Sequence, residues 1–311
     1  MALSPRLIRR RIKSVANTRK ITKAMELVAA SKMRKTVQLA QASRPYAATM
    51  KAMVDEVRQL VDPQTHPLLA GRKDVAASLV IVAASDRGLC GGFNSQLLKK
   101  TMEFLRSRTE SDIRVITVGR RAEAAVRRAG YQIVAAFDAI SNAPSFERTQ
   151  PIGDYVYKEF MAGHVDRAFV VYTDFRSAIT QVPTATQLLP IIPEAELVGQ
   201  EAKVEEDESD DEGHVRPDNE EEGVYESAIL FEPNPEKVLD ALLPRLLETR
   251  IYQTLLESSA SEHSARMMAM RSATDNASDM LQDLTLTFNQ ARQAGITREI
   301  SEISAGKAAI E

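Results

Sequence analysis

No glycine precedes Gly71 in this chain, and between Pro5 and Leu60 only Pro45 could interrupt a helix. Because glycine and proline are the residues that most often end helices, we predict one long helix over residues 4–59. Pro5 suits the first helical position. A helix of this length is a rod of roughly 80 Å. We expect Pro45 to bend the rod or to start a new segment, because proline removes a backbone hydrogen bond.

Apolar and small residues recur along this rod in steps of three, four and seven, the spacing of one helical face. The members of this face are Ile8, Ile12, Val15, Thr22, Ala29, Met33, Val37 and Ala40. A second, shorter stripe of Ile21, Met25 and Val28 lies beside it. The rod is therefore expected to pack along a narrow seam.

The C-terminal part, from about residue 235 to 305, has the same character. We expect Pro244 to kink or divide its helix, and the glycines that follow are Gly295 and Gly306. A seven-residue repeat runs through Ile251, Ser258, Ala265, Ser272, Asp279 and Leu286, with Leu255, Ala269 and Asn276 at intervening positions. Such a seam of small and polar residues lets two helices approach closely but stabilises them weakly. Two terminal helices of this kind predict an antiparallel coiled-coil shaft.

Between the two helices, apolar runs alternate with helical patterns. Strands are expected at 77–85, 113–118, 131–136 and 167–173, and helices at about 93–109, 120–129 and 145–162. This alternation predicts a Rossmann-like α/β domain with a mostly parallel sheet. Two further stretches, 178–189 and 224–231, are expected to be edge strands.

The charge of the chain is divided between two segments. Residues 194–223 hold 14 acidic and two basic side chains, whereas residues 1–60 hold 14 basic and three acidic ones. The acidic insert is too polar to bury a core, so we expect it to be disordered. The chain then divides into an N-terminal shaft helix (1–60), an α/β foot domain (61–233) and a C-terminal shaft helix (234–311).

The motifs for catalysis and cofactor binding are weak. The turn SDRGLCGGFN (85–94) joins a strand to a helix, but it lacks the lysine of a P-loop and the spacing of a dinucleotide-binding loop. Cys90 is the single cysteine, so an internal disulfide and a cysteine zinc site are excluded. The four histidines lack zinc spacing, and the run EEDESDDE lacks the pattern of a calcium loop. We therefore predict no catalytic site, no metal and no cofactor.

The sequence favours neither a membrane-spanning or secreted protein nor a nucleic-acid-binding protein. No apolar run is long enough to span a membrane, and the basic N-terminus lacks the apolar region of a secretory signal. The basic first helix could contact the phosphates of a nucleic acid, but no aromatic residue precedes Tyr46 for base stacking. Its charge indicates an acidic partner, and a protein can serve as well as a nucleic acid.

Three segments carry a resemblance to a known family. NTRKITKAMELVAASKMRK (17–35), SDRGLCGGFN (85–94) and SARMMAMRSATDNASDM with ARQAGITREISEI (264–303) resemble the γ subunit of F-type ATP synthases, in the same order. The resemblance implies an axle, one copy per α3β3 ring, that passes torque between the proton-driven c-ring and the catalytic sites on β. It also implies contacts with α, β, ε and the c-ring, and a peripheral place on the cytoplasmic face of the bacterial inner membrane. The chain itself would catalyse no reaction and bind no nucleic acid.

The resemblance also assigns roles to particular residues. Residues implied in coupling and in contact with β are Met25, Arg266, Gln293, Thr297, Glu299 and Glu302. Basic residues implied nearer the foot are Lys32, Arg34 and Lys35. From the pattern alone, Met25 is a seam residue and the charged residues form a solvated helix face.

This chain departs from the family pattern in the length and acidity of residues 194–223 and in Lys307, where the family usually has a small residue. The paired cysteines of the redox-regulated chloroplast form are absent, so we predict no thiol switch. Two alternatives stay open at this point. One is a structural or nucleic-acid-binding coiled-coil protein with an α/β head, and the other is an α/β enzyme that uses Cys90.

Overall fold

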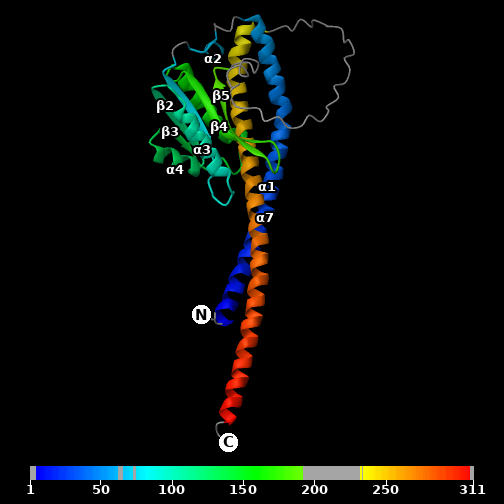
Figure 1. Cartoon of the computed structure of the whole chain (residues 1–311). Coiled ribbons are helices and arrows are strands. Elements are labelled where there is room, and N and C mark those ends of the chain that lie inside the picture. Colours follow the sequence, from blue (N-terminus) through cyan, green and yellow to red (C-terminus); the bar gives the residue numbers. More distant parts are fainter. Residues whose placement is uncertain (1–4, 62–65, 73–74, 192–231, 233, 309–311) are drawn as a thin grey trace, which may run out of the picture.

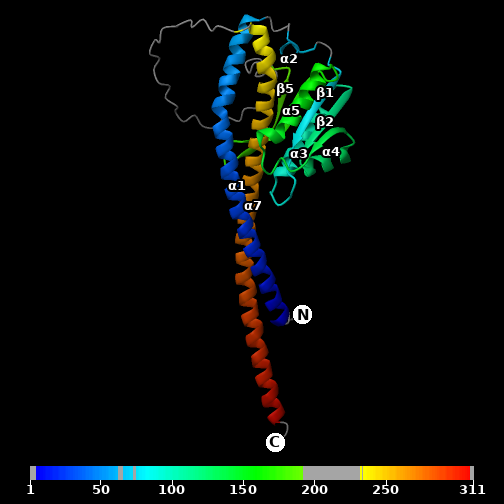
Figure 2. The same ribbon diagram turned by 180° about the vertical axis from the view of Figure 1, so that it is seen from behind.

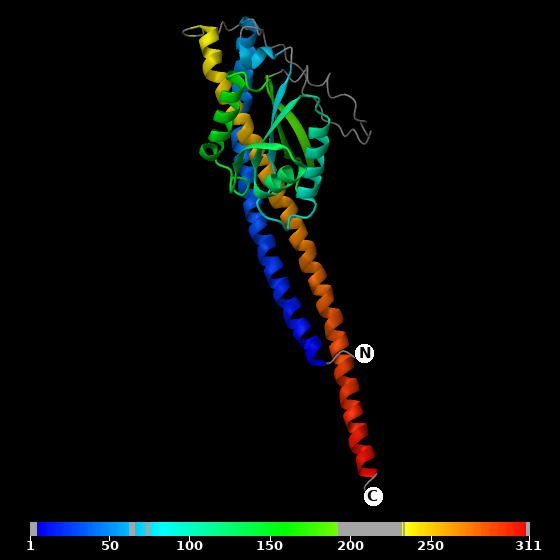
Figure 3. The same ribbon diagram turned by 90° about the vertical axis from the view of Figure 1, so that its left-hand side faces the viewer.

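The structure, a computed structural model, describes residues 5–61, 66–72, 75–191, 232 and 234–308. Its two longest elements, α1 (Pro5–Leu60) and α7 (Pro235–Ala308), run side by side in opposite directions (Figures 1 and 2). We call this pair the shaft. An α/β domain lies beside one end of the shaft, and α7 continues well past the start of α1 at the other end (Figure 3). The predicted two-helix shaft with an α/β domain is confirmed.

The shaft seam on α1 follows the predicted stripe. Ile8 and Ala29 are each only 2% exposed. The Thr274 hydroxyl of α7 donates a hydrogen bond to the Thr22 hydroxyl at 2.8 Å, which ties the two helices together near the middle of the seam. Small seam residues allow this close approach, as the sequence indicated.

The predicted seam on α7 is right in its first half and wrong in its second. Ile251 and Ser258 are buried, but the later members Ser272, Asn276, Asp279 and Leu286 are exposed. Toward α1 the helix presents Thr274, with Met270 and Ala277 buried one turn to either side. The reason is that α7 has two partners on different faces. The repeat through Ile251 and Ser258 faces the α/β domain, and beyond the domain Ser272, Asp279 and Leu286 on that face are exposed among the described residues.

Neither proline divides its helix. Helix α1 continues through Pro45, and α7 continues through Pro244. A new segment at Pro45 and a division at Pro244 were therefore wrong predictions. Long-range packing outweighs the one missing hydrogen bond, because most helical stability in proteins comes from the buried face. Around Pro244 that face includes Leu243 and Leu247, both almost fully buried.

The domain is built on a five-stranded sheet. Its strands are β1 (Ala77–Ala83), β2 (Asp112–Val118), β3 (Gln132–Phe137), β4 (Arg167–Phe175) and β5 (Gln181–Leu189). They lie in the order β3-β2-β1-β4-β5, and all neighbours are parallel except β4 and β5. The predicted edge strand at 178–189 is confirmed as β5. The predicted strand at 224–231 and the acidic insert 194–223 lie outside the described residues.

Helices cover both faces of the sheet, and β1 separates two cores. Val80 and Val82 of β1 pack with α3 (Phe93–Arg106) and α4 (Arg120–Ala129). Leu79 and Ile81 face the other core, which contains α5 (Phe146–Met161), the short α2 (Pro67–Ala70) and parts of α1 and α7. From α7 this core takes Leu239, Leu243, Leu247, Ile251 and Leu255. The shaft and the domain therefore share one hydrophobic core, and α7 acts as a covering helix of the sheet.

Candidate functional site

Directly after this shared core, α7 carries a polar segment that is buried on all sides. The seven consecutive residues 258–264 are each at most 8% exposed, and six of them are polar or charged. A helix is usually buried all round only when it is apolar all round. Polar side chains in such a place cost free energy unless they are hydrogen-bonded. We call residues 258–266 the junction segment.

Three serines of the junction segment donate hydrogen bonds to backbone carbonyls of the domain. Ser258 reaches the Ala83 carbonyl at the end of β1 at 3.1 Å, and Ser261 reaches the Thr173 carbonyl of β4 at 3.1 Å. Ser264 reaches the Ala178 carbonyl, in the turn between β4 and β5, at 2.6 Å. Each such bond contributes about 1 kcal/mol net to stability. The serines therefore hold the shaft to three separate segments of the domain.

A buried ion pair lies beside the serines. Glu262 and Arg266 are one helical turn apart on α7, with Nη2 and Oε1 at 2.8 Å and side chains only 4% and 11% exposed. Burial raises the pKa of Glu262 to about 7, although the Arg266 charge acts in the opposite direction. Arg266 also donates from Nη2 to the carbonyls of Arg87 and Gly88 at 3.3 and 3.5 Å. The pair thus joins α7 to the turn between β1 and α3.

His263 completes this arrangement in its neutral form. Its Nε2 lies 3.1 Å from the Asn142 carbonyl, which can only accept, so Nε2 carries the proton. Its Nδ1 accepts from Arg266 at 3.3 Å. Burial lowers the pKa of His263 to about 4, with smaller contributions from Arg266 and Lys32 in the same direction. The hydrogen bonds and the pKa therefore agree on a neutral ring.

The turn 85–94 is held by hydrogen bonds among its own residues, and its cysteine is buried. Cys90 is 2% exposed, and the Asn94 side-chain amide donates to its sulfur at 3.0 Å. Cys90 packs in the core shared with α3 and α4, as expected of a structural cysteine. Among the described residues, no group of histidine, cysteine and carboxylate side chains could hold a metal ion. Within the same residues, no helix is long and apolar enough to cross a membrane.

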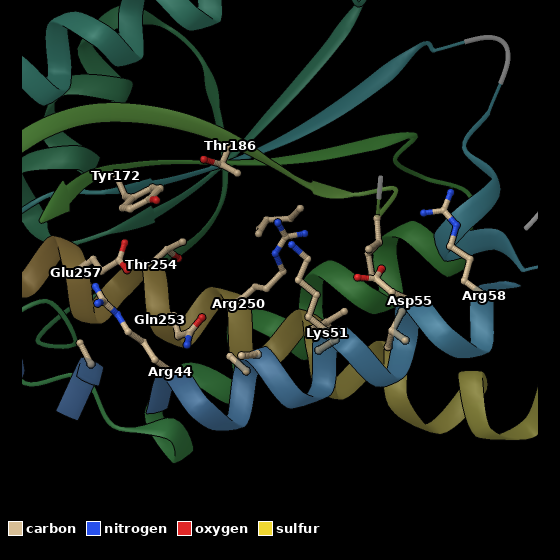
Figure 4. Close-up of a pocket in the computed structure, with 17 residues that line it drawn as sticks. Arg44, Lys51, Asp55, Arg58, Tyr172, Thr186, Arg250, Gln253, Thr254 and Glu257 are labelled. Carbon is tan, nitrogen blue, oxygen red and sulfur yellow. The ribbon is translucent and has the colours of Figure 1, made fainter. Parts of the chain in front are cut away.

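A cavity of about 490 Å³ opens between α1, α7 and the outer strands (Figure 4). Cations from both helices line it, among them Arg44, Lys51, Arg58 and Arg250. Glu257 and Tyr172 lie at one end, where burial raises the pKa of both side chains. Lys51 and Arg250 already interact with other groups. Among the described residues the lining contains neither a histidine nor a cysteine, and the cavity offers mainly charged and polar contacts.

The structure does not bring the predicted coupling residues into one cluster. Residues 289–308 of α7 continue past the start of α1, and we call them the free end (Figure 3). Arg266 lies at the junction, whereas Gln293, Thr297, Glu299 and Glu302 are exposed on the free end. The 27 residues from Arg266 to Gln293 correspond to about 40 Å along a helix. Thr297 donates to the Gln293 carbonyl of its own helix at 3.0 Å.

The predicted residues on α1 also separate. Met25 is half-buried along the shaft, and Arg34 and Lys35 are exposed. Lys32 reaches the domain itself, because its ammonium donates to the Asn142 side-chain oxygen at 2.8 Å. Of the basic residues expected near the foot, Lys32 therefore touches it directly.

Sequence reasoning missed Ser258, Ser261, Glu262, His263 and Ser264 as a functional group of residues. The seam was interpreted as weak because it is small and polar. The available signal was the run SSASEHS (258–264) inside a long helix, since serine competes with the helical backbone and is disfavoured there. Such a run indicates that the side chains have partners outside the helix.

Comparisons with known proteins agree over nearly the whole chain. A family model described as ATP synthase matches residues 4–310. The ATP synthase gamma chain of Pelotomaculum thermopropionicum is 40% identical over 308 residues, which cover 99% of each chain. That of Opitutus terrae is 41% identical over 304 residues, which cover 98% of each.

Solved structures show the same fold. A chain in the OSCP/F1/c-ring structure of Euglena gracilis mitochondrial ATP synthase aligns with a TM-score of 0.62 at 20% identity, over 99% of this chain and 94% of that one. A chain in the central stalk/c-ring structure of the Tetrahymena thermophila enzyme aligns with a TM-score of 0.56 at 24% identity, over 81% of this chain and 99% of that one.

Proposed function

This chain belongs to the ATP synthase γ chain family, and we propose that it works as the central rotor of an F-type enzyme. In this role it transmits torque between a proton-driven c-ring and a catalytic α3β3 ring, with one copy per ring. ATP synthesis and hydrolysis take place on the partner subunits, and this chain supplies the mechanical connection.

The observation that carries the proposal is the free end of α7. Ile296, Ile300 and Ile303 are 45%, 59% and 68% exposed there, although they lie on one helical face at the spacing i, i+4, i+7. A single helix with an exposed apolar stripe is marginally stable in water. An apolar sleeve formed by a surrounding ring of subunits would cover this stripe. The length of the shaft beyond the domain suits such an insertion (Figure 3).

The charges of α1 support acidic partners along the rest of the shaft. Residues 1–60 carry 14 basic and three acidic side chains, and arginines and lysines such as Arg10, Arg34 and Lys35 are exposed. Exposed charges make reversible, screened contacts, which suits a surface that must turn past successive neighbours. On the resemblance to the γ family, we assign Met25, Gln293, Thr297, Glu299 and Glu302 to contacts with β, and the four residues on α7 are exposed for such contacts.

The domain end of the shaft is assigned to the c-ring and the ε subunit. Lys32 and Arg266 then act inside the chain, because both bond to the domain, while Arg34 and Lys35 face partners. The complex is peripheral to the cytoplasmic face of a bacterial inner membrane, where the c-ring provides the membrane-embedded part. The alternative of a nucleic-acid-binding protein has no observation in its favour beyond the basic charge.

Reconstitution tests the proposal. The purified chain is mixed with α and β subunits, and the composition of the complex and its ATP hydrolysis are measured. We expect one copy per α3β3 and hydrolysis that depends on the chain. Absence of assembly, under conditions where another γ subunit assembles, would contradict the rotor role.

A matched pair of variants tests the free end directly. The triple change Ile296→Asp, Ile300→Asp and Ile303→Asp places three charges on the apolar stripe, and we expect it to abolish or strongly reduce chain-dependent hydrolysis. The control Asn289→Asp, Ser301→Asp and Ser304→Asp adds the same charge at exposed polar positions of the same region. Equal activity of the two variants would remove the support that the stripe provides.

A further inference from the structure

We infer that the junction segment of α7, residues 258–266, is the element that locks the α/β domain to the shaft against rotation, with Ser258, Ser261, Ser264 and Arg266 as positioning residues. The inference rests on the proposed rotor function and adds a location for the transfer of torque within the chain. Torque that enters through the domain must reach the shaft through contacts that resist rolling.

The hydrogen bonds of the junction segment approach α7 from different sides. Residues two positions apart on a helix point to nearly opposite directions. Ser264 bonds to the β4–β5 turn, and Arg266 bonds to the turn between β1 and α3. A roll of α7 in either direction therefore lengthens at least one of these bonds.

The bonds also reach the rigid part of the domain. Ser258 bonds to the last residue of β1, the central strand of the sheet, and Ser261 bonds to β4 beside it. The pairing of β1 with β4 ends at Val82 and Val171, but Ala83 is still paired with Val118 of β2, and Thr173 is still paired with Pro183 of β5. A force on the domain thus acts on α7 through backbone that belongs to the sheet.

The apolar contacts that lie earlier on α7 are of a different kind. Leu239, Leu243 and Leu247 attach α7 to the domain through burial, which is strong but has no preferred direction. Apolar surfaces can slide past each other at small cost as long as they stay covered. Hydrogen bonds weaken steeply when their angle changes. Burial therefore keeps the domain on the shaft, and the junction segment sets its angle.

Serine suits this role because of its size. At 258 and 261 a longer polar side chain would hold the strands away from the helix, and alanine would remove the serine donor to the Ala83 and Thr173 carbonyls. At 264 alanine would leave the Ala178 carbonyl with the Gln181 side-chain amide as a donor but would break its link to the shaft. All three serines are at most 6% exposed. Nearby, Lys32 of α1 adds a more exposed bond to the domain, from its ammonium group to the side-chain oxygen of Asn142.

The test uses complete ATP synthase in sealed vesicles, with this chain as its γ subunit. ATP hydrolysis and ATP-driven proton uptake are measured in the same vesicles, and their ratio is the coupling ratio. The variant is the triple change Ser258→Ala, Ser261→Ala and Ser264→Ala. The control is Ser14→Ala, Ser31→Ala and Ser272→Ala, which removes three exposed serines from the two shaft helices, α1 and α7.

We expect the triple variant to keep hydrolysis near the wild-type rate, because the free end of α7 is unchanged, while its coupling ratio falls to less than half. Three hydrogen bonds of ordinary net strength correspond to roughly a 100-fold more frequent slip of the domain around the shaft. The control should keep the wild-type ratio. If the triple variant does not assemble, Ser261→Ala alone is measured, and a lowered ratio is again expected.

A loss of stability alone would lower hydrolysis and proton uptake together and leave their ratio unchanged, and that result would overturn the inference. An unchanged ratio with unchanged rates would do the same, since torque would then pass through the shaft without the junction segment. Wild-type vesicles that hydrolyse ATP without taking up protons would contradict the rotor proposal itself, and this inference with it.

Discussion

The junction segment and the free end of α7 belong to one helix, but the junction buries polar and charged side chains, whereas the free end exposes apolar ones. At the junction, Glu262 is 3% exposed, whereas Ile303 at the free end is 68% exposed. Charged residues are almost never buried without a partner, and exposed apolar stripes usually mark a contact surface. Apart from Ser259, whose buried hydroxyl has no hydrogen-bond partner among the described residues, the polar side chains of the junction have partners within the chain. The free end has its partners, as we propose, in other subunits.

This difference separates two kinds of experiment. Changes at the junction should affect the isolated chain, because every contact is internal. Changes at the free end should leave the isolated chain almost unaltered and appear only in the assembled ring.

The largest effect is expected from Arg266→Ala. The change leaves Glu262 buried without its cation and removes the donor to the Arg87 and Gly88 carbonyls. Loss of one partner of a buried pair typically costs about 3–5 kcal/mol. Urea unfolding of the isolated chain measures this cost. At the free end, Arg298→Ala serves as the exposed control, with an expected change within about 0.5 kcal/mol. Similar losses in the two variants would contradict the division.

A second prediction uses the two titrating groups of the junction, Glu262 and His263, whose pKa values are shifted in opposite directions. The pKa of Glu262 is raised from 4.5 to about 7, so the folded chain binds this proton more tightly than the unfolded chain. Glu262 therefore lowers stability as the pH rises from about 4.5 to about 7. The pKa of His263 is lowered from 6.5 to about 4, so His263 lowers stability as the pH falls from about 6.5 to about 4.

In the wild type these two contributions offset each other over much of the range, and single variants separate them. The stability of Glu262→Gln relative to the wild type should grow by about 3 kcal/mol as the pH rises through the first window. For His263→Gln, the stability relative to the wild type should grow by a similar amount as the pH falls from about 6.5 to about 4. Using differences from the wild type cancels the other charges near the pair, which include Asp86, Lys32 and Arg266. Unfolding free energies at closely spaced pH values measure both slopes, and slopes of equal sign would refute the assignment.

Two glycines give the third prediction. Gly119, between β2 and α4, has φ +90°, and an added Cβ would lie 2.2 Å from the Ala84 carbonyl oxygen. Gly119→Ala should therefore destabilise the isolated chain by at least about 2 kcal/mol, from backbone strain and the clash together. Gly295, at the free end, has open space around it. Gly295→Ala should stabilise the helix by up to about 1 kcal/mol, measured as helical content by circular dichroism. Destabilisation by both changes would show that the free end is not a solvated helix.

The smallest effect on the isolated chain is expected from Ile300→Asp. Its side chain is 59% exposed, so unfolding of the isolated chain should change by no more than about 0.5 kcal/mol. In the reconstituted ring the same change should lower hydrolysis clearly. A large loss of stability in the isolated chain would mean that Ile300 already packs within it.

Much of the fold was predictable because its signals are local. The helix 120–129 matches α4 at both ends, where Gly119 and Gly130 lie. The strands β1 and β4 appear as apolar runs, since a strand covered on both faces must be apolar on both. The two terminal helices follow from the scarcity of glycine and proline. The candidate site was harder to predict, because its donors lie on α7 and its acceptors are backbone carbonyls, which have no signature in the sequence.

Local patterns in the amino-acid sequence were enough to predict the long helices and most of the strands, the α/β class, the antiparallel pairing and, through three long motifs, the family. Which face of α7 meets the domain and which meets α1 is visible only in the folded chain. The structure also showed that Arg266 lies apart from Gln293 and that SSASEHS is a hydrogen-bonded junction rather than a weak seam. The physical reason is that periodicity specifies which residues share a face, whereas the partner of that face depends on contacts between residues far apart in the chain. Ser258 and Ala83, 175 positions apart, are one such contact.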